Sequence, residues 1–300
     1  MKKDLLSIKE LSPGSVKNIL KLTARIKRKK KSFSNKLKLK TIGLIFEKPS
    51  NRTRVSFEVG VNQLGGNSLY LDPQSIQLKK REALKDVAST LSRYLDGIVL
   101  RTFSHKDQEE FAQYFTKGLI NGLSDLVHPC QALADMFTVK EKFGRTNGVK
   151  FAYVGDGNNV CNSLILAAGK LGVDMHIATP PGYEPDKRIV DYVVREGASL
   201  FLGSDPYQAV KDAQVVYTDV WVSMGQESER TERLNAFKGY QINEDLLKTA
   251  DKNYVFMHCL PAHRGEEVAD SVIDGPHSIV FDQAENRLHT QKAVMVKLFS

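Results

Sequence analysis

The sequence has few cysteines, and their spacing excludes two classes of protein. Among 300 residues there are three, Cys130, Cys161 and Cys259, which lie far apart and form no CxxC pair. Disulfide frameworks and structural zinc sites need closer or more numerous cysteines. We therefore expect a protein of a reducing compartment, the cytoplasm.

Long apolar runs are also missing. No stretch approaches the roughly 18 consecutive apolar residues that a membrane helix needs. At the N-terminus, Lys9 and Glu10 interrupt the segment in which a secretory signal would carry its apolar core. The composition, with 41% hydrophobic and 26% charged residues, is that of a globular protein with one large or two compact domains. We expect no membrane partner.

Acidic residues are missing from one segment only. Residues 21–40 contain ten Lys and Arg and no Asp or Glu. The whole chain has a net charge of +8, so the residues outside this segment have a net charge of −2. Nucleic-acid binding would usually add aromatic side chains that stack on bases, and this segment has only Phe33. We interpret the segment as an exposed surface, with nucleic-acid binding as the weaker alternative.

Short apolar runs alternate with helical stretches along the whole chain. Strands are predicted at 41–47, 68–72, 97–102 and 119–123, and a second series of about five strands begins at 149–155. This alternation is typical of parallel sheets covered by helices on both faces. The prediction is an α/β protein with two such domains and a helix near 132–143 between them. Ligands of such sheets bind beyond the carboxyl ends of the strands.

The stretch KPSNRTR (48–54) follows the first predicted strand and carries the clearest functional signal. Ser50 and Asn51 are residue types that begin helices. Arg52 and Arg54 then place cations in the first turn, where the helix dipole disfavours each by about 0.3–1 kcal/mol. A bound anion would remove this conflict, because it accepts hydrogen bonds from the exposed N–H groups and the guanidinium groups. We predict a phosphate site; a pair of solvated arginines is the alternative.

Other strand ends carry weaker signals. Arg101 ends the third strand, and His128 and Gln131 follow the fourth. Cys259 ends the last strand, within HCLPAHRGEE, where a buried structural cysteine is an equal alternative. His258, Cys259 and His263 do not match a zinc pattern, and no fourth ligand is near them in the sequence.

The segment GDGNN (155–159) only partly resembles a dinucleotide-binding fingerprint. The position of the third glycine holds Val160, and the next strand ends without the acidic residue that would bind a ribose. A dinucleotide-dependent oxidoreductase is therefore a poor interpretation. The amide groups of this segment suit an amino-acid carboxylate instead. Asp219 and Ser223, beside the apolar Trp221 and Met224, suit a substrate with an ammonium group.

Six motifs together resemble the aspartate/ornithine carbamoyltransferase family, on its ornithine-using branch. They occur in the family's order over nearly the whole chain: FEKPSNRTRVSFE (46–58), HPCQALAD (128–135), GDGNN (155–159), DVWVSMG (219–225), HCLPAH (258–263) and FDQAENRLHTQKAVM (281–295). Each alone is weak evidence, and six in order are specific.

The resemblance implies two doubly wound parallel-sheet domains joined by interdomain helices. Residues 1–132 would bind carbamoyl phosphate, with the C-terminal helix 284–300 packing on this domain, and residues 133–283 would bind ornithine. The implied activity is transfer of the carbamoyl group from carbamoyl phosphate to the side-chain amine of L-ornithine, which gives L-citrulline and phosphate. The implied assembly is a homotrimer or a multiple of trimers, with sites at subunit boundaries.

The resemblance also assigns residues. The phosphate would be held by Ser50, Asn51, Arg52, Thr53 and Arg54. The carbamoyl end would be contacted by Arg101, His128 and Gln131, with Gln77 from a neighbouring subunit. Cys259 and Leu260 would line the reaction centre, and Arg287 would return from the terminal helix. Ornithine would be bound by Asn159, Asp219, Ser223 and Met224. Asn51 stands where the family usually has threonine, and its amide still donates a hydrogen bond.

The expected chemistry is attack of an amine on the carbamoyl carbon, with Arg52, Arg101, His128 and Cys259 in catalytic roles. We expect neither a metal nor an organic cofactor. The nearest alternative is a carbamoyltransferase with another acceptor, such as putrescine or an acylated ornithine; the motif SMG (223–225) favours plain ornithine. The sequence leaves open whether the reaction serves arginine synthesis or runs in the catabolic direction.

Overall fold

The computed structural model describes residues 3–74, 82–223 and 225–300. The chain divides into two compact units. Unit 1 consists of Met1–Phe137 with Glu285–Ser300, and unit 2 of Thr138–Ala284. Two helices cross the unit boundary along the chain, α5 (Pro129–Phe143) and α12 (Val280–Phe299).

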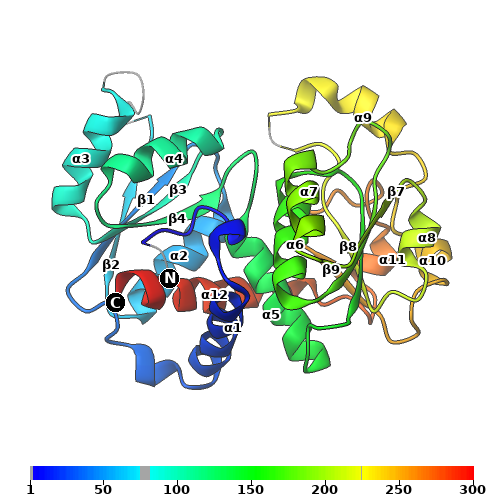
Figure 1. The fold of residues 1–300 in the computed structure, drawn as a ribbon, viewed down its shortest axis with the longest axis horizontal. Helices are drawn as coiled ribbons and strands as arrows, with labels where there is room; N and C mark the ends of the chain where they lie inside the picture. The colour runs from blue at the N-terminus through cyan, green and yellow to red at the C-terminus, as the bar shows by residue number, and fades with distance from the viewer. Residues whose placement is uncertain (1–2, 75–81, 224) are drawn as a thin grey trace. The chain divides into compact units, whose positions relative to one another are not determined.

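Unit 1 is built on a four-stranded parallel sheet in the order β2-β1-β3-β4. Its elements before α5 are η1 (Ile8–Glu10), α1 (Pro13–Arg28), η2 (Lys30–Phe33), β1 (Thr41–Phe46), α2 (Asn51–Gln63), β2 (Asn67–Leu71), α3 (Leu84–Tyr94), β3 (Gly97–Arg101), α4 (His105–Tyr114) and β4 (Gly118–Leu123). Helices α3 and α4 cover one face of the sheet, and α1, α2 and α12 lie on the other (Figure 1). The first face is closed by an apolar cluster that includes Val87, Phe111 and Phe115.

Unit 2 contains a five-stranded parallel sheet in the order β7-β6-β5-β8-β9. Its elements after α5 are β5 (Lys150–Val154), α6 (Asn159–Leu171), β6 (Asp174–Ala178), α7 (Lys187–Arg195), β7 (Leu200–Gly203), α8 (Pro206–Val210), β8 (Val215–Thr218), η3 (Glu227–Glu229), α9 (Arg230–Ala236), α10 (Glu244–Leu247), β9 (Val255–His258) and α11 (Asp270–Ile273). Helices α6 and α7 lie on one face of this sheet, and α8, α10 and α11 on the other (Figure 1).

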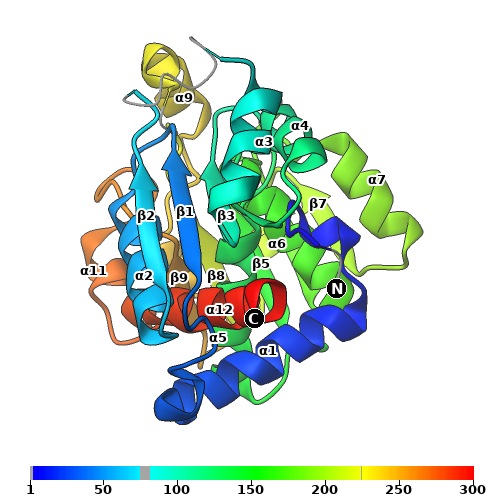
Figure 2. The same cartoon turned by 90° about the vertical axis from the view of Figure 1, so that its left-hand side faces the viewer.

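The terminal helix α12 packs on unit 1, as the resemblance implied. It runs beside α2 on the same face of the sheet (Figure 2). A Cβ atom at Gly60 of α2 would lie 2.9 Å from Cε of Met295 on α12, so glycine allows the two helices to approach closely. Phe299, near the end of α12, packs where Gly97 and Gly118 begin β3 and β4.

Each sheet has one point at which the order of its strands reverses. In unit 1 the chain proceeds from β1 outward to β2 and then returns to β3, so the reversal lies between β1 and β3. In unit 2 it lies between β5 and β8. Ligands of doubly wound sheets bind at the carboxyl ends of the strands beside such a reversal point.

The predicted elements agree with the structure in type and order, and they differ mainly at their ends. Helix α5 begins at Pro129 instead of about residue 132, since proline is tolerated in the first helical turn. Helix α1 extends from Pro13, with its N-terminus capped by the hydroxyl of Ser12, and this start was not predicted. None of the helices among the described residues is long and apolar enough to cross a membrane.

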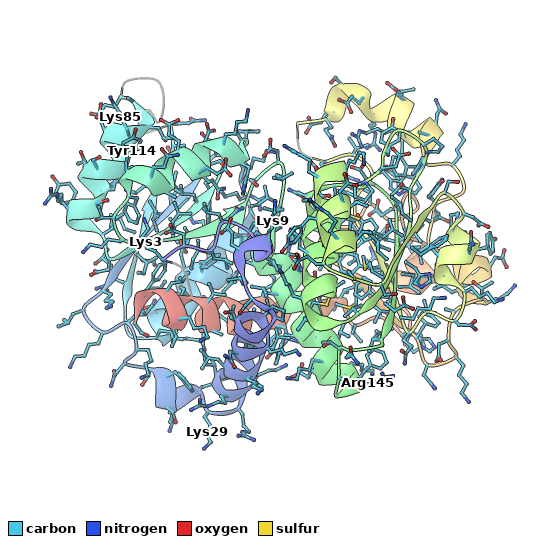
Figure 3. The ribbon with its side chains drawn as sticks, viewed as in Figure 1. Lys3, Lys9, Lys29, Lys85, Tyr114 and Arg145 are labelled. Atoms are coloured by element: carbon cyan, nitrogen blue, oxygen red, sulfur yellow. The ribbon has the colours of Figure 1, made fainter. Side chains whose placement is uncertain are left out.

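The basic segment 21–40 covers the end of α1, η2 and the turn before β1. Eight of its ten Lys and Arg residues are exposed. The side chain of Lys29 projects outward there (Figure 3). The structure thus agrees with the interpretation of this segment as a surface feature.

Candidate active site

The N-terminus of α2 lies at the reversal point of the first sheet. Ser50 is its N-cap, and the hydroxyl accepts a hydrogen bond from the backbone N–H of Thr53 at 3.3 Å. The hydroxyl of Ser50 also lies 3.1 Å from that of Thr53. Asn51 and Arg52 follow in the first turn, with Asn51 exposed and Arg52 partly buried. No acidic residue occupies the first turn of α2. The unpaired N–H groups at the start of a helix carry partial positive charge, so this turn together with Arg52 is positively charged.

Arg287 of α12 connects three elements of this region. Its guanidinium group donates to the hydroxyl of Thr53 at 3.1 Å and also donates to Oε1 of Gln131 on α5. The amide of Gln131 donates in turn to Asp135 at 2.8 Å. Arg287, Thr53, Gln131 and Asp135 are all buried. These hydrogen bonds fix the orientation of the guanidinium group.

Arg101, at the end of β3, supplies a second buried guanidinium group. Its Nε donates to the backbone carbonyl of Lys48, at 3.0 Å, in the loop that leads to α2. The same loop is tied to β3 by Glu47, whose backbone N–H donates to the carbonyl of Arg101 and whose carboxylate accepts from the N–H of Phe103 at 3.0 Å. The ends of β1 and β3 are thereby held together.

His128 is buried among these cations, and its pKa shows the effect. Burial is the main cause that holds the pKa of His128 well below its ordinary value, followed by the charges of Arg287, Arg101 and Arg52. The imidazole is therefore neutral at pH 7. A neutral imidazole near three guanidinium groups can donate one hydrogen bond to a carbonyl oxygen without adding charge.

Arg54 lies in a different environment from Arg52. Its Nε donates to Glu58 at 2.9 Å, and its guanidinium carbon stands 3.7 Å from the ring centroid of Tyr70 on β2. The side chain is exposed on the surface formed by α2 and β2. Residues two positions apart in a helix do not face the same direction, which explains why Arg52 and Arg54 separate. The predicted contact of Arg54 with phosphate stays a prediction.

At the reversal point of the second sheet, hydrogen bonds join the ends of three strands. Asn158 caps α6 by accepting from the backbone N–H groups of Val160 and Cys161, and its amide donates to Oδ2 of Asp219 at 2.8 Å. Asp219 follows β8 and is buried. Its Oδ1 accepts from the thiol of Cys259, after β9, at 2.9 Å. The predicted residues Asp219 and Cys259 are thus brought together, with Asn159 at the start of α6.

A buried ion pair beside this group was missed by sequence reasoning. Arg233 of α9 donates to Asp156, after β5, at 3.1 Å, and to the carbonyl of Trp221 at 3.0 Å. Burial raises the pKa of Asp156 to about 6, although Arg233 opposes the shift. The lone acid in GDG was the available signal, but its partner lies 77 residues away.

The glycine pattern of GDGNN has a local explanation. A Cβ atom at Gly157 would lie 2.3 Å from the backbone of Glu184 and Pro185. The N–H of Gly157 donates to the carbonyl of Tyr183 at 2.8 Å. The second glycine therefore admits a neighbouring loop, and the resemblance to a dinucleotide fingerprint needs no nucleotide to explain it.

The remaining predicted residues are placed as follows. Leu260 has a left-handed backbone conformation (φ +58°) and donates its N–H to Nδ1 of His258 at 2.8 Å. The backbone N–H of Ser223 donates to the side chain of Gln226 at 3.0 Å. Gln77 and Met224 lie outside the described residues.

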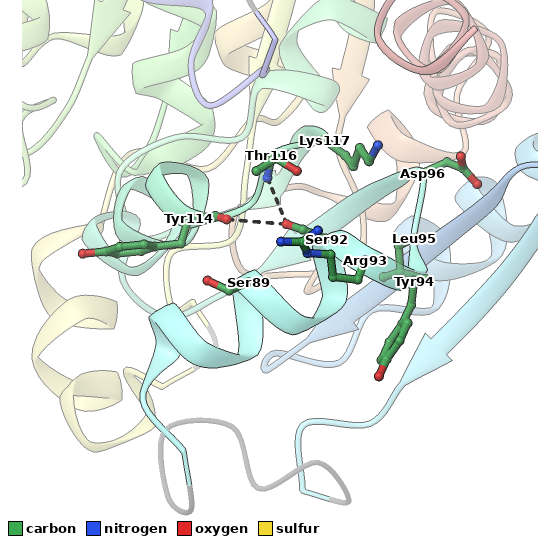
Figure 4. Close-up of a pocket in the computed structure, with 9 residues that line it drawn as sticks. All are labelled: Ser89, Ser92, Arg93, Tyr94, Leu95, Asp96, Tyr114, Thr116 and Lys117. Atoms are coloured by element: carbon green, nitrogen blue, oxygen red, sulfur yellow. Dashed lines mark hydrogen bonds between the residues drawn. The ribbon is translucent and has the colours of Figure 1, made fainter.

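A separate pocket of about 530 Å³ lies at the end of the first sheet where the strands begin, opposite the end that carries Arg101 (Figure 4). Its lining includes Asp96 and Lys117, which directly precede β3 and β4, together with Ser92, whose hydroxyl accepts from the N–H of Thr116 at 2.9 Å. Because it lies at the amino ends of the strands, this pocket does not belong to the cluster around His128.

Family models match both units of the chain. The carbamoyl-phosphate-binding domain of aspartate/ornithine carbamoyltransferases matches residues 3–141, and the aspartate/ornithine-binding domain matches residues 147–298. The chain belongs to this family.

Ornithine carbamoyltransferases of several organisms are similar to this chain over almost its full length. An ornithine carbamoyltransferase of Thermococcus kodakarensis is 54% identical, with 98% of this chain and 95% of the relative covered. An anabolic ornithine carbamoyltransferase of Pyrococcus furiosus is 52% identical (98% and 95% covered), and a catabolic one of Thermoplasma volcanium is 49% identical (100% and 99%).

Among solved structures, an ornithine carbamoyltransferase from Pyrococcus furiosus superposes with a TM-score of 0.95 at 52% identity. The match covers 99% of this chain and 96% of that chain. The two-unit fold is therefore that of the carbamoyltransferases.

The buried His128 predicts a pH dependence of this carbamoyltransferase-family protein. Because its folded pKa is lowered, the unfolded state binds more protons below the ordinary histidine pKa of about 6.5, and the free energy of unfolding falls as the pH falls below that value. The slope is at most about 1.4 kcal/mol per pH unit for one group. Urea unfolding of His128→Gln between pH 7 and 5 should show a shallower loss than the unsubstituted protein. Equal slopes of unfolding free energy against pH in the two proteins would contradict the lowered pKa of His128.

Proposed function

We propose that this protein transfers the carbamoyl group of carbamoyl phosphate to the side-chain amine of L-ornithine, giving L-citrulline and phosphate. The observation that carries the proposal is the cluster at the first reversal point, where Arg52, Arg101 and Arg287 surround a neutral His128 at a helix N-terminus. Such a cluster matches a phosphate dianion joined to a polar carbonyl group.

Each part of carbamoyl phosphate has a counterpart in this cluster. The phosphate binds to the first turn of α2, through Ser50, Asn51, Arg52 and Thr53. Arginine suits the leaving dianion because its planar fork binds two oxygens at once. The carbamoyl end is bound by residues that come from β3, α5 and α12: Arg101, His128, Gln131 and Arg287. Arg54 completes the phosphate contacts, and Gln77 reaches the carbamoyl end from a neighbouring subunit.

Ornithine is bound by the residues at the second reversal point. Asp219 pairs with the α-ammonium group, and Asn159 and Ser223 bind the polar end, with Met224 along the aliphatic stem. The support is the burial of Asp219 and its fixed geometry, since Asn158 and Cys259 hold its two oxygens. A carboxylate held in this way is preorganised for a cation.

The reaction requires a neutral amine. With lysine as a guide (pKa about 10.4), deprotonation at pH 7 costs about 4–5 kcal/mol. Desolvation beside Cys259 and Leu260 lowers this cost. The amine nitrogen then attacks the carbamoyl carbon, the C–O bond to phosphate breaks, and the proton lost by nitrogen leaves with phosphate. Arg52, Arg101 and His128 stabilise the oxyanion of the intermediate, and holding both substrates in place supplies much of the acceleration.

We infer a homotrimeric assembly, or a multiple of trimers, in the cytoplasm. Val55 and Val59 of α2 and Leu69 of β2 are apolar and exposed, which favours contact with another chain beside the phosphate residues. The three cysteines are free thiols, consistent with a reducing compartment. Light scattering that gave a single chain per particle would contradict the trimer.

We infer that the reaction runs toward citrulline and serves arginine synthesis. Carbamoyl phosphate is a mixed anhydride, so transfer of its acyl group to an amine is chemically downhill. A deletion strain that grew without added arginine would speak against this role.

The direct test of the activity is citrulline formation from carbamoyl phosphate and a panel of amines: ornithine, putrescine and N-acetylornithine. We expect product with ornithine only, because the α-carboxylate and the α-ammonium group each have a partner. Citrulline formation is measured with and without a chelator. Faster product formation with putrescine or N-acetylornithine would show that ornithine is not the acceptor.

Replacement of Arg52 tests the phosphate cluster. Arg52→Ala removes a preorganised cation, and we expect kcat to fall about 10²- to 10³-fold. The melting temperature should change little, since the side chain is only partly buried. The matched control is Arg93→Ala, which removes an exposed arginine from the pocket at the other end of the sheet. Near-normal turnover of the Arg52 variant would refute its role.

Replacement of Asp219 tests the ornithine residues. Asp219→Asn keeps the size of the side chain and removes its charge, which costs about 1.5–3 kcal/mol for a hydrogen bond to a charged group. We expect KM for ornithine to rise about 10- to 100-fold, while KM for carbamoyl phosphate stays within about twofold. The control is Asp245→Asn, an exposed carboxylate on α10. An unchanged KM for ornithine would remove Asp219 from the site.

A further inference from the structure

The chain after β9 folds back on itself around a completely buried carboxylate, that of Glu267. Its Oε1 accepts hydrogen bonds from Nε2 of His258 at 3.2 Å and from the backbone N–H of His263 at 2.5 Å. Nδ1 of His258 accepts from the N–H of Leu260, so Nε2 carries the proton that is donated to Glu267. Glu267 therefore links both ends of the HCLPAH segment.

Three buried polar atoms beside this link have no hydrogen-bond partner among the residues that the structure describes. They are Nδ1 of His263, Oε2 of Glu266 and Oε2 of Glu267. A potential ligand atom from each of the three residues lies within 4.8 Å of the other two. An unsatisfied buried polar atom destabilises the folded state, and a charged one does so more strongly. Unpartnered atoms on three residues whose potential ligand atoms lie this close together would be satisfied by a shared cation.

The separations favour a metal ion over direct hydrogen bonds. Nδ1 of His263 and Oε2 of Glu266 are 3.7 Å apart, which is too long for a hydrogen bond. Ligands at about 2.0–2.1 Å from a tetrahedral zinc ion lie roughly 3.4 Å from one another. A contraction of a few tenths of an ångström would therefore bring this pair onto one ion.

The neighbouring charges leave these ligand atoms available. Arg230 binds Oε1 of Glu266 and leaves Oε2 to face the cluster. Arg264 is engaged with Asp270 and Asp274. One imidazole nitrogen and two carboxylate oxygens are a ligand set that zinc and its neighbours among the divalent transition metals accept. The bond from His258 to Glu267 has the form of the outer-shell contacts that orient metal ligands.

A second group of potential ligands nearby is less suited to an ion. Asp219, His258 and Cys259 also offer atoms within 4.8 Å of one another. However, Cys259 already donates to Asp219 at 2.9 Å. Both ring nitrogens of His258 are engaged, with the N–H of Leu260 and with Glu267.

We propose that His263, Glu266 and Glu267 form a binding site for one divalent transition-metal ion of the zinc type, which braces the loop that carries Cys259 and Leu260. Sequence reasoning did not find this site because it looked for cysteine and histidine ligands only. The two glutamates that complete it are adjacent in the sequence and look like ordinary surface charges.

Metal binding to the full-length protein tests the proposal. The protein is treated with a chelator, dialysed and titrated with Zn²⁺ by calorimetry and with Co²⁺ by visible absorption. We expect one ion per chain, a higher melting temperature with Zn²⁺, and a cobalt spectrum without a thiolate charge-transfer band. His263→Gln and Glu266→Gln, both at partly exposed residues, should each weaken binding at least about tenfold. Glu232→Gln, at an exposed carboxylate of α9, is the matched control and should bind normally.

A further variant separates the two ligand groups. Cys259→Ser should retain the ion, and loss of binding in that variant alone would move the site to Asp219 and Cys259. The absence of binding, or unchanged affinity in His263→Gln and Glu266→Gln, would overturn the proposal. A melting temperature that rises at acid pH and ignores Zn²⁺ would show that the cluster holds a proton instead. These measurements do not use transferase activity, so their failure is distinguishable from failure of the proposed function.

Discussion

The arrangement of residues around His128 depends on the hydrogen bonds of the Arg287 guanidinium group. It binds Thr53 on α2 and Gln131 on α5, and it belongs to α12, so one side chain connects three helices. Its charge, with those of Arg101 and Arg52, adds to burial in keeping His128 neutral. The fold thus brings like charges together around an imidazole, an arrangement that a bound dianion would stabilise.

The two sheets use the same geometry with opposite charge. In each unit the candidate residues follow the two strands that flank the reversal point, and a capped helix begins there. The first unit supplies cations from Arg52 and Arg101, whereas the second supplies the carboxylate of Asp219. Backbone topology therefore explains why the candidate residues gather at these two points, and the side chains after the strands give the two points opposite charge.

Local signals made the fold and part of the site predictable. Apolar runs identified the strands of both sheets, and the conflict between Arg52 and the dipole of α2 led to the prediction of a phosphate site. The resemblance to a family added Arg287 and Cys259, which no local pattern would have joined. The roles assigned to all of these residues remain predictions, and Gln77 and Met224 also lie outside the part of the chain that the structure describes.

Other features could not be predicted because they depend on contacts between distant residues. Asp156 meets Arg233 across 77 positions, and no periodicity indicates this pair. Arg52 and Arg54 look equivalent in sequence, yet Arg54 stacks on Tyr70. Asn158 caps α6 and also donates to Asp219, 61 positions away in the sequence. In each case the fold decides which atoms a polar side chain reaches.

The discontinuity of unit 1 has a consequence for biogenesis. On the ribosome, residues 1–137 emerge well before α12, and all of unit 2 is synthesised in between. Until then the nascent first unit lacks the helix that packs against Gly60, and it lacks Arg287. Only after the final helix is released can this unit complete its core and join Arg287 to Thr53 and Gln131.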